Sequence, residues 1–322
     1  MNAIPSLSRR GILSLSLGAG LVLTGCAKNS GGSGSSSASG SGAPKVSKVD
    51  AAAFDKIVTG GPVAQDADIA ASPWAKKIKD AGVLRWGGTN TSTIFSLLNP
   101  ATGRLLGFDA GMVDLLGHYI LGGSDVAKLA KLSQTSVDTR ETMLQNHTVD
   151  TVVATYSITP ARAAKVDFAG PYYTSGDAIQ VKADNTTINS LSDLDGKKIA
   201  TESNSTAITA IKAKIKNANV QLFSDNDSCV TAVVQGRVDA YVLDQSILLS
   251  NAASNPQVKV VGQPFTTDAY GIGVPKDDPT AKQFVNKFLK AIEAGGQWDA
   301  MWKLCIGPYV QGNPPQPPAI QG

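Results

Sequence analysis

The chain has 322 residues, of which 42% are hydrophobic, so it is long enough to form two lobes that each bury an apolar core. Its formal net charge is +3, which falls to +1 when Arg9 and Arg10 are removed with an N-terminal leader. This near-neutral balance excludes an electrostatic case for nucleic-acid binding, and we expect no nucleic-acid partner.

Residues 1–25 have the features of an export signal. Two arginines precede an apolar run from Gly11 to Leu23, and the sequence Leu23-Thr24-Gly25-Cys26 follows. These four residues resemble a bacterial lipobox, which implies cleavage before Cys26, a lipid on Cys26 and attachment to the outer face of the membrane. An ordinary signal peptide or a transmembrane anchor is the alternative, although the run is shorter than the ~20 residues of a spanning helix. The segment 8–13 also resembles a twin-arginine motif, so both general and twin-arginine export stay open.

Residues 26–78 are predicted to be a lipidated cysteine followed by a flexible tether. The composition is almost wholly Gly, Ser and Ala as far as Pro44, and such a segment cannot bury apolar surface. Residues 45–78 mix charges with Pro and Gly, and only Trp74 and Ile78 suggest contact with a core. We expect this second part to be a lightly ordered arm.

The cysteine count predicts one disulfide. If Cys26 carries a lipid, Cys229 and Cys305 are left as a pair outside the cytosol, where disulfides persist. Two buried free thiols are the alternative.

Strand and helix patterns alternate twice along the chain, which predicts an α/β fold of parallel sheets with covering helices. In the first series we expect strands at 83–87, 126–132 and 149–154 and helices at 108–120, with Asp109 as N-cap, and 137–146. In the second series we expect strands at 199–201, 220–223 and 238–243 and helices at 205–216 and 227–235. Linking strands near Ser175 and Tyr270 let the chain leave the first lobe and return to it. The predicted lobes are 79–175 with 273–311, and 176–272, followed by a flexible proline-rich tail at 312–322, and a cleft between hinged lobes is a natural ligand site.

The loop after the strand at 149–154 combines small hydroxyls with one guanidinium. Ligands of open α/β sheets bind beyond the carboxyl ends of strands, and an arginine there suits a carboxylate, so Arg162 and Ser157 are predicted to bind one. Asp244 ends the equivalent strand of the second lobe and is predicted to accept from an ammonium, with N-capping of the next helix as the alternative. Ser205 and Thr206 offer hydroxyls at a helix start. The combination predicts a clamp for a zwitterion.

Several segments together resemble the polar amino-acid binding proteins of ABC importers over about residues 79–307. The segments are Gly107-Phe108-Asp109, Val149-Asp150, Ile158-Thr159-Pro160-Ala161-Arg162, Val166-Asp167-Phe168-Ala169-Gly170-Pro171-Tyr172-Tyr173 and Leu194-Asp195-Gly196-Lys197-Lys198. The resemblance implies a type II periplasmic-binding-protein-like fold, with two Rossmann-like lobes on a two-strand hinge. It also implies that Thr155, Ser157 and Arg162 hold the ligand carboxylate and that Asp244 holds the ammonium.

The same resemblance bears on specificity. Arg140 stands in a segment similar to that of glutamate and aspartate binders, which favours glutamate, then aspartate, with glutamine and asparagine close behind. Two departures weaken this preference: Asn90 stands where some acidic-ligand relatives place another arginine, and Glu202 stands where many have lysine or threonine. Glu202 suits an amide, or it pairs with Lys198 or Arg140. Phe95 is expected either to stack on the ligand or to belong to the core.

The function that follows is a non-enzymatic, monomeric, lipid-anchored binding protein. It is expected to deliver an amino acid to an ABC permease whose ATPase is a separate chain, because this chain has no phosphate loop. No cofactor is expected, and His118 and His147 have no companion motif for a metal. The alternatives are a receptor lipoprotein read by a membrane sensor, or an exported dehydratase on the same scaffold with Glu202 as its one candidate acid.

Overall fold

A computed structural model describes residues 48–310 and 313–321. The predicted leader, Cys26 and the glycine-rich and serine-rich segment lie outside these residues. None of the described helices combines the length and the apolarity that crossing a bilayer requires.

The first lobe is built on a five-stranded sheet with the order β5-β1-β6-β13-β7. Its strands are β1 (Leu84–Gly88), β5 (Ala130–Gln134), β6 (Thr151–Val152), β7 (Asp167–Ser175) and β13 (Asp268–Val274). The first three are mutually parallel, whereas β13 runs antiparallel to both β6 and β7. A small sheet of β2 (Thr91–Ser92), β3 (Ser96–Leu98) and β4 (Leu105–Leu106) adjoins it.

Helices pack around this first sheet and bury two apolar clusters. The helices are α4 (Phe108–Leu121), α5 (Arg140–Gln145), α6 (Pro160–Ala163), α10 (Pro279–Ala294) and α11 (Gln297–Cys305), with short 3-10 turns at Val126–Lys128 and Gly307–Tyr309. The large cluster contains α4, and the smaller one lies beside α5 and α6. Twelve of the fourteen residues of α4 are buried, so this helix is the centre of the lobe rather than a surface helix. It ends at Gly122, whose left-handed conformation (φ +70°) suits a glycine C-cap.

The second lobe repeats the plan with its own sheet, in the order β10-β9-β11-β8-β12. Its strands are β8 (Asp177–Lys182), β9 (Lys198–Glu202), β10 (Asn219–Phe223), β11 (Ala240–Asp244) and β12 (Val258–Val261). Its helices are α7 (Ala207–Lys214), α8 (Asn226–Val234) and α9 (Gln245–Ser254), with a 3-10 turn at Leu191–Leu194. A separate apolar cluster, which includes Ile199, Ala232 and Val242, forms its core.

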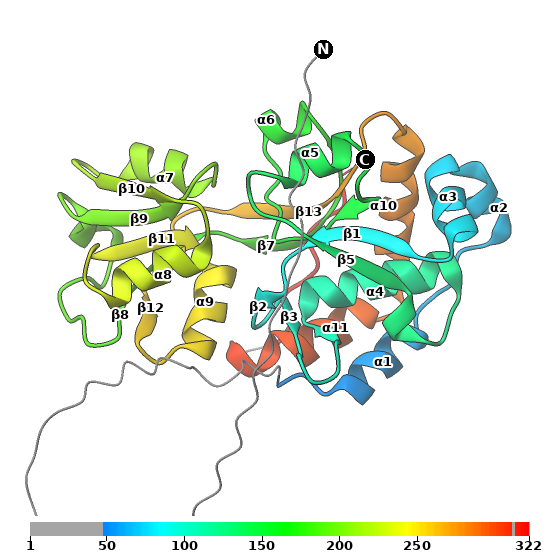
Figure 1. Ribbon diagram of the computed structural model, residues 1–322, viewed down its shortest axis with the longest axis horizontal. Coiled ribbons are helices and arrows are strands. Elements are labelled where there is room, and N and C mark those ends of the chain that lie inside the picture. Colours follow the sequence, from blue (N-terminus) through cyan, green and yellow to red (C-terminus); the bar gives the residue numbers. More distant parts are fainter. Residues whose placement is uncertain (1–47, 311–312, 322) are drawn as a thin grey trace, which may run out of the picture. The chain divides into compact units, whose positions relative to one another are not determined.

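Two antiparallel strands connect the lobes. The chain leaves the first sheet along β7, turns at Gly176 into β8, and returns along β13 (Figure 1). The predicted fold of two α/β lobes joined by a two-strand hinge is therefore confirmed. The sheets are mixed rather than wholly parallel, because the returning strand of the hinge and β8 and β12 run against their neighbours.

The prediction of a flexible arm as far as residue 78 was wrong from Asp50 onward. This segment forms α1 (Ala51–Thr59), α2 (Asp66–Ala71) and α3 (Pro73–Ala81). Phe54 and Val58 are fully buried and stand four residues apart, so that both lie on one face of a short helix. The Trp74 indole donates a hydrogen bond to the backbone oxygen of Asp150 at 2.9 Å. Burial of these side chains in the core of the first lobe stabilises helices too short to persist alone.

The described part of the tail is also ordered against the first lobe, contrary to the prediction. The Gln321 backbone N–H donates to the Gly170 oxygen at 2.8 Å, and the Asn286 amide donates to the Gln321 oxygen at 3.0 Å. Ile320 packs on the core of the same lobe. Hydrogen bonds to its backbone thus order the tail, although its sequence has no periodic pattern of apolar residues.

The prediction of a disulfide was wrong: Cys229 and Cys305 are both free thiols, and both are buried. Cys229 lies on α8 in the core of the second lobe, and Cys305 ends α11 in the core of the first. The Cys305 thiol contacts the Met301 sulfur at 3.7 Å. A disulfide needs Cα atoms within about 7 Å of each other, which cysteines in separate cores do not meet.

We expect a reducing agent to leave the unfolding temperature unchanged, since no cross-link constrains the unfolded chain. Alkylation of denatured, unreduced protein followed by mass mapping should recover Cys229 and Cys305 as free thiols. A drop of several degrees on reduction would contradict the assignment.

Candidate functional site

A cavity of about 290 Å3 is lined by residues of both lobes. Eight of the ten residues predicted to contact ligand line it, namely Arg140, Thr155, Ser157, Arg162, Glu202, Ser205, Thr206 and Asp244. Asn90 and Phe95 are not among its lining residues. Phe95 is 1% exposed and packs its ring against Phe108 and Tyr173, so it belongs to the core.

The backbone at Thr155 is held in an unusual conformation beside the cavity. Its φ is +47°, which is strained for a β-branched residue. The Thr155 N–H donates to Asp109 Oδ2 at 2.8 Å, and the Tyr172 hydroxyl donates to Asp109 Oδ1 at 2.7 Å. Burial raises the pKa of Asp109 to about 7. Asp109 therefore positions the loop, and the prediction that it caps α4 was wrong, since Gly107 occupies the N-cap position.

Gly107 explains why α4 can begin so close to the small sheet. Its φ is +143°, and a Cβ at this position would lie 2.4 Å from the Phe95 carbonyl carbon. Only glycine fits there, and the resulting close approach brings Asp109 in the first turn of α4 to Thr155.

Arg162 is 7% exposed, and its guanidinium is oriented from both lobes. One nitrogen, Nη1, donates to the Ser157 backbone oxygen at 2.9 Å, and Nη2 donates to the Asn204 backbone oxygen of the second lobe at 3.2 Å. Its carboxylate neighbour, Glu141, lies 3.8 Å from Nε and also pairs with Lys165 at 2.7 Å. Burial lowers the pKa of Arg162, because the cation is only partly compensated.

Arg140 is a second buried guanidinium in the same wall. It is 5% exposed, donates from Nη1 to the Ala154 oxygen at 3.3 Å, and has a buried Nε with no hydrogen-bond partner among the described residues. Its Cζ lies 4.0 Å from the centre of the Tyr156 ring, and that of Arg162 lies 5.4 Å from it. Burial, and then repulsion from Arg162, lower the pKa of Arg140 to about 10. Two under-compensated cations make this wall favourable for an anion.

The wall contributed by the second lobe is acidic. Asp244 ends β11 and is 4% exposed, and its Oδ1 is buried without a hydrogen-bond partner among the described residues. It occupies the N-cap position of α9, but its side chain makes no capping hydrogen bond. Burial raises the pKa of Asp244 to about 6. Ser175, Tyr270 and the Gly176 backbone also hydrogen-bond to this carboxylate, so Oδ1 is the oxygen available to a cationic group.

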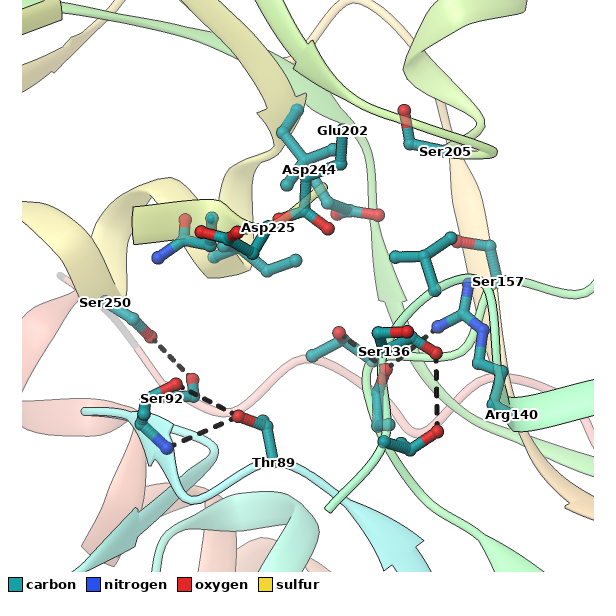
Figure 2. A pocket seen from close by; sticks show the side chains of 18 of the residues that line it. Thr89, Ser92, Ser136, Arg140, Ser157, Glu202, Ser205, Asp225, Asp244 and Ser250 are labelled. Atoms are coloured by element: carbon teal, nitrogen blue, oxygen red, sulfur yellow. Dashed lines mark hydrogen bonds between the residues drawn. The ribbon is translucent and has the colours of Figure 1, made fainter. Parts of the chain in front are cut away.

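Glu202 ends β9 and lines the same wall. Its Oε1 accepts a hydrogen bond from the Tyr241 hydroxyl at 3.1 Å, and burial raises its pKa to about 7. Figure 2 shows Glu202, Asp244 and Asp225 on one side of the cavity and Arg140 and Ser136 on the other. The cavity therefore has a cationic wall and an anionic wall.

The sequence did not indicate most of the remaining lining residues. Asp225, the N-cap of α8, accepts from the Ser228 N–H at 2.8 Å, a pattern that could have marked this helix start. The side-chain amides of Asn226 and Asn251 bond to each other at 3.0 and 2.8 Å. Hydroxyls supply much of the rest, from Thr89, Thr91, Ser92, Thr135, Ser136, Ser224 and Ser250. The cavity therefore has many small hydrogen-bonding groups, and no aromatic side chain of the described residues lines it.

Direct contacts join the lobes at two sides of the cavity. The Ser92 and Ser250 hydroxyls lie 3.2 Å apart, and Ser250 also accepts from the Ile94 N–H at 3.3 Å. Elsewhere the Asn204 amide donates to Asp138. Among the described residues no group of three or more His, Cys, Asp or Glu side chains is placed to hold a metal ion.

A family model, related sequences and solved structures all match this chain to the same kind of protein. The family model of the bacterial extracellular solute-binding proteins, family 3, matches residues 84–304. An ABC transporter glutamine-binding protein of Bacillus subtilis is 33% identical over 230 residues, covering 71% of this chain and 83% of the relative. A glutamate-binding protein of Corynebacterium efficiens is 38% identical over 166 residues, covering 49% of this chain and 56% of the relative. Among solved structures, an ancestral arginine-binding protein bound to glutamine is 32% identical with a TM-score of 0.60, covering 70% of this chain and 98% of that one.

Proposed function

Because the chain belongs to family 3 of the bacterial extracellular solute-binding proteins, we propose that its cavity captures a polar amino acid, with glutamate favoured, for an ABC transporter. The family is extracellular, so the protein acts after export, and it is a binding protein rather than an enzyme. Aspartate, glutamine and asparagine follow glutamate in the expected order of affinity.

The observation that carries this proposal is the pairing of buried charges across one cavity. Arg162 lies in one wall and Asp244 in the other, and each is less than a tenth exposed. A free amino acid has a carboxylate and an ammonium on one carbon, so it can satisfy both walls at once. Buried charges gain most from such partners, because water cannot compensate them.

Arg140 supports the preference for an acidic side chain. Its unpartnered Nε and its raised positive potential beside Arg162 suit the second carboxylate of glutamate. Glu202 supports an amide instead, since a carboxylate can accept from a side-chain NH2 group. The relatives named above include one glutamate-binding and one glutamine-binding protein, which matches this mixture of signals.

We further propose that Cys26 carries a lipid that anchors the mature chain to the outer face of the membrane. The anchored protein would act as a monomer and deliver its ligand to a permease driven by a separate ATPase. Lipid labelling of wild type, lost in Cys26→Ser, would support the anchor.

Calorimetry of the purified mature chain with L-glutamate, L-aspartate, L-glutamine, L-asparagine and L-arginine tests the function. We expect saturable binding with a stoichiometry of one, strongest for L-glutamate, and D-glutamate serves as the matched control. Saturation by none of the five would contradict amino-acid capture, whereas tighter binding of L-glutamine would contradict only the order.

A further inference from the structure

Asp177 is a buried carboxylate that the clamp described above does not use. It is the first residue of β8, directly after the turn by which the chain enters the second lobe. Its side chain is 1% exposed, and neither carboxylate oxygen has a hydrogen-bond partner among the described residues. It is not one of the residues that line the cavity.

The strand register places Asp177 beside Asp244. In the antiparallel pair of β8 and β11, Asp244 lies directly opposite Asp177. Side chains of directly opposed residues point to the same face of a sheet, with Cβ atoms about 4.5–5.5 Å apart. Two buried carboxylates therefore adjoin each other, and one of them, Asp244, faces the cavity.

The surrounding elements supply little positive charge. Asp268 on β13 adds a negative charge, and Tyr173 on β7 is a further titratable group. Tyr270 on β13 and Ser175 on β7 hydrogen-bond to Asp244 and lower its pKa, and Arg162 on α6 is the cation that acts on Asp244. Helix α9 has no charged residue, α8 contributes Asp227, and Glu202 ends β9. The one cation of β12, Lys259, donates to the Asn185 oxygen at 2.7 Å, at the other end of β8.

Two carboxylates this close, in a site shielded from water, cannot both ionise without cost. Burial and the neighbouring Asp244 raise the pKa of Asp177 to about 7, and burial raises that of Asp244 to about 6. The two groups titrate as a pair, so the first and second protons belong to the pair rather than to one residue.

We propose that Asp177 forms a carboxylate pair with Asp244, that this pair holds one proton while the cavity is empty, and that the ammonium of an amino acid displaces the proton on binding. The proton leaves to solvent, and the ammonium then neutralises the second negative charge. Asp177 is thus a positioning residue that makes the ammonium subsite doubly acidic. The inference rests on the proposed function, since it places the ligand ammonium at Asp244.

The direct test is the number of protons released when L-glutamate binds, measured by calorimetry at pH 6.5 in two buffers of different ionisation enthalpy. For wild type we expect roughly one half to one proton per glutamate, and an affinity about tenfold lower at pH 5.5 than at pH 7.5. Asp177→Asn should release less than half of the wild-type number and show a flatter pH dependence. Asp184→Asn is the matched control, because this aspartate follows the same strand and is 74% exposed.

One further variant and a stability measurement separate the Asp177–Asp244 pair from other sources of proton release. Glu202→Gln removes a second buried carboxyl of the acidic wall and should keep most of the proton release. Because the native state of wild type binds the extra proton, its stability falls as pH rises through the titration of the pair. The unfolding temperature of Asp177→Asn should therefore exceed that of wild type, and by more at pH 8 than at pH 5.

Binding without proton release, or release that persists in Asp177→Asn and disappears in Glu202→Gln, would overturn the inference. An Asp177→Asn protein less stable than wild type at pH 8 would also overturn it. If wild type binds no amino acid at either pH, the proposed function fails instead, and the two failures are therefore distinguishable.

Discussion

Arg162→Ala is expected to remove measurable binding of every amino acid, whatever its side chain. The guanidinium is fixed by Ser157 of its own lobe and Asn204 of the other, and we expect it to bind the carboxylate that all amino acids share. Removing one partner of a buried charge pair costs about 2–5 kcal/mol, or roughly 30-fold to several thousandfold in affinity. Calorimetry with L-glutamate and L-glutamine measures both losses.

The structure indicates that this variant will still fold. Glu141, the carboxylate nearest to Arg162, keeps Lys165 as a partner at 2.7 Å, so this ion pair does not depend on Arg162. Arg237→Ala is the matched control, because Arg237 is exposed and does not line the cavity. Retention of L-glutamate affinity within threefold of wild type would refute the role of Arg162 in the clamp.

Arg140→Ala is expected to discriminate between ligands. Hydrogen bonds that involve charged groups contribute about 1.5–3 kcal/mol, so L-glutamate should bind roughly 10- to 150-fold more weakly, and L-glutamine should lose less than tenfold. The difference arises because the side-chain carboxylate of glutamate loses an ionic partner, while an amide loses a neutral acceptor contact.

This variant should not be destabilised through a lost ion pair. Arg140 donates only to the Ala154 oxygen and stacks on Tyr156, and Glu202 and Glu141 only partly offset the cost of burying its charge. We expect an unfolding temperature close to that of wild type. Equal losses for L-glutamate and L-glutamine would show that Arg140 does not contact the ligand side chain.

The local pattern of the sequence was sufficient for the architecture and for two of the buried charged residues that line the cavity. Periodicity and turn residues encode which segments become strands, and a polar residue directly after a buried strand must emerge at its carboxyl end. Arg162 and Asp244 could be selected in this way, and the resemblance to amino-acid binding proteins connected them before their separation in space was known.

Long-range packing decided what the sequence pattern left open or misjudged. Phe95 could have contacted the ligand or belonged to the core, and its packing against Phe108 and Tyr173 places it in the core. The number of cysteines says nothing about the distance between them. The folded chain places Cys229 and Cys305 in separate cores, so they cannot form the predicted disulfide. The arm around Phe54 and Val58 is helical because it is buried, which a short polar stretch does not reveal.

By itself, then, the sequence determined the alternation of elements and the charged residues at the strand ends, since each depends on residues near one another in the chain. Only the tertiary structure decided that Arg140 lacks a full partner, that Asp109 holds Thr155, and that Asp177 lies against Asp244. These are relations between residues 46 to 67 positions apart, or between a side chain and a cavity. Charge compensation and burial depend on the final packing, and no local pattern in the chain encodes them.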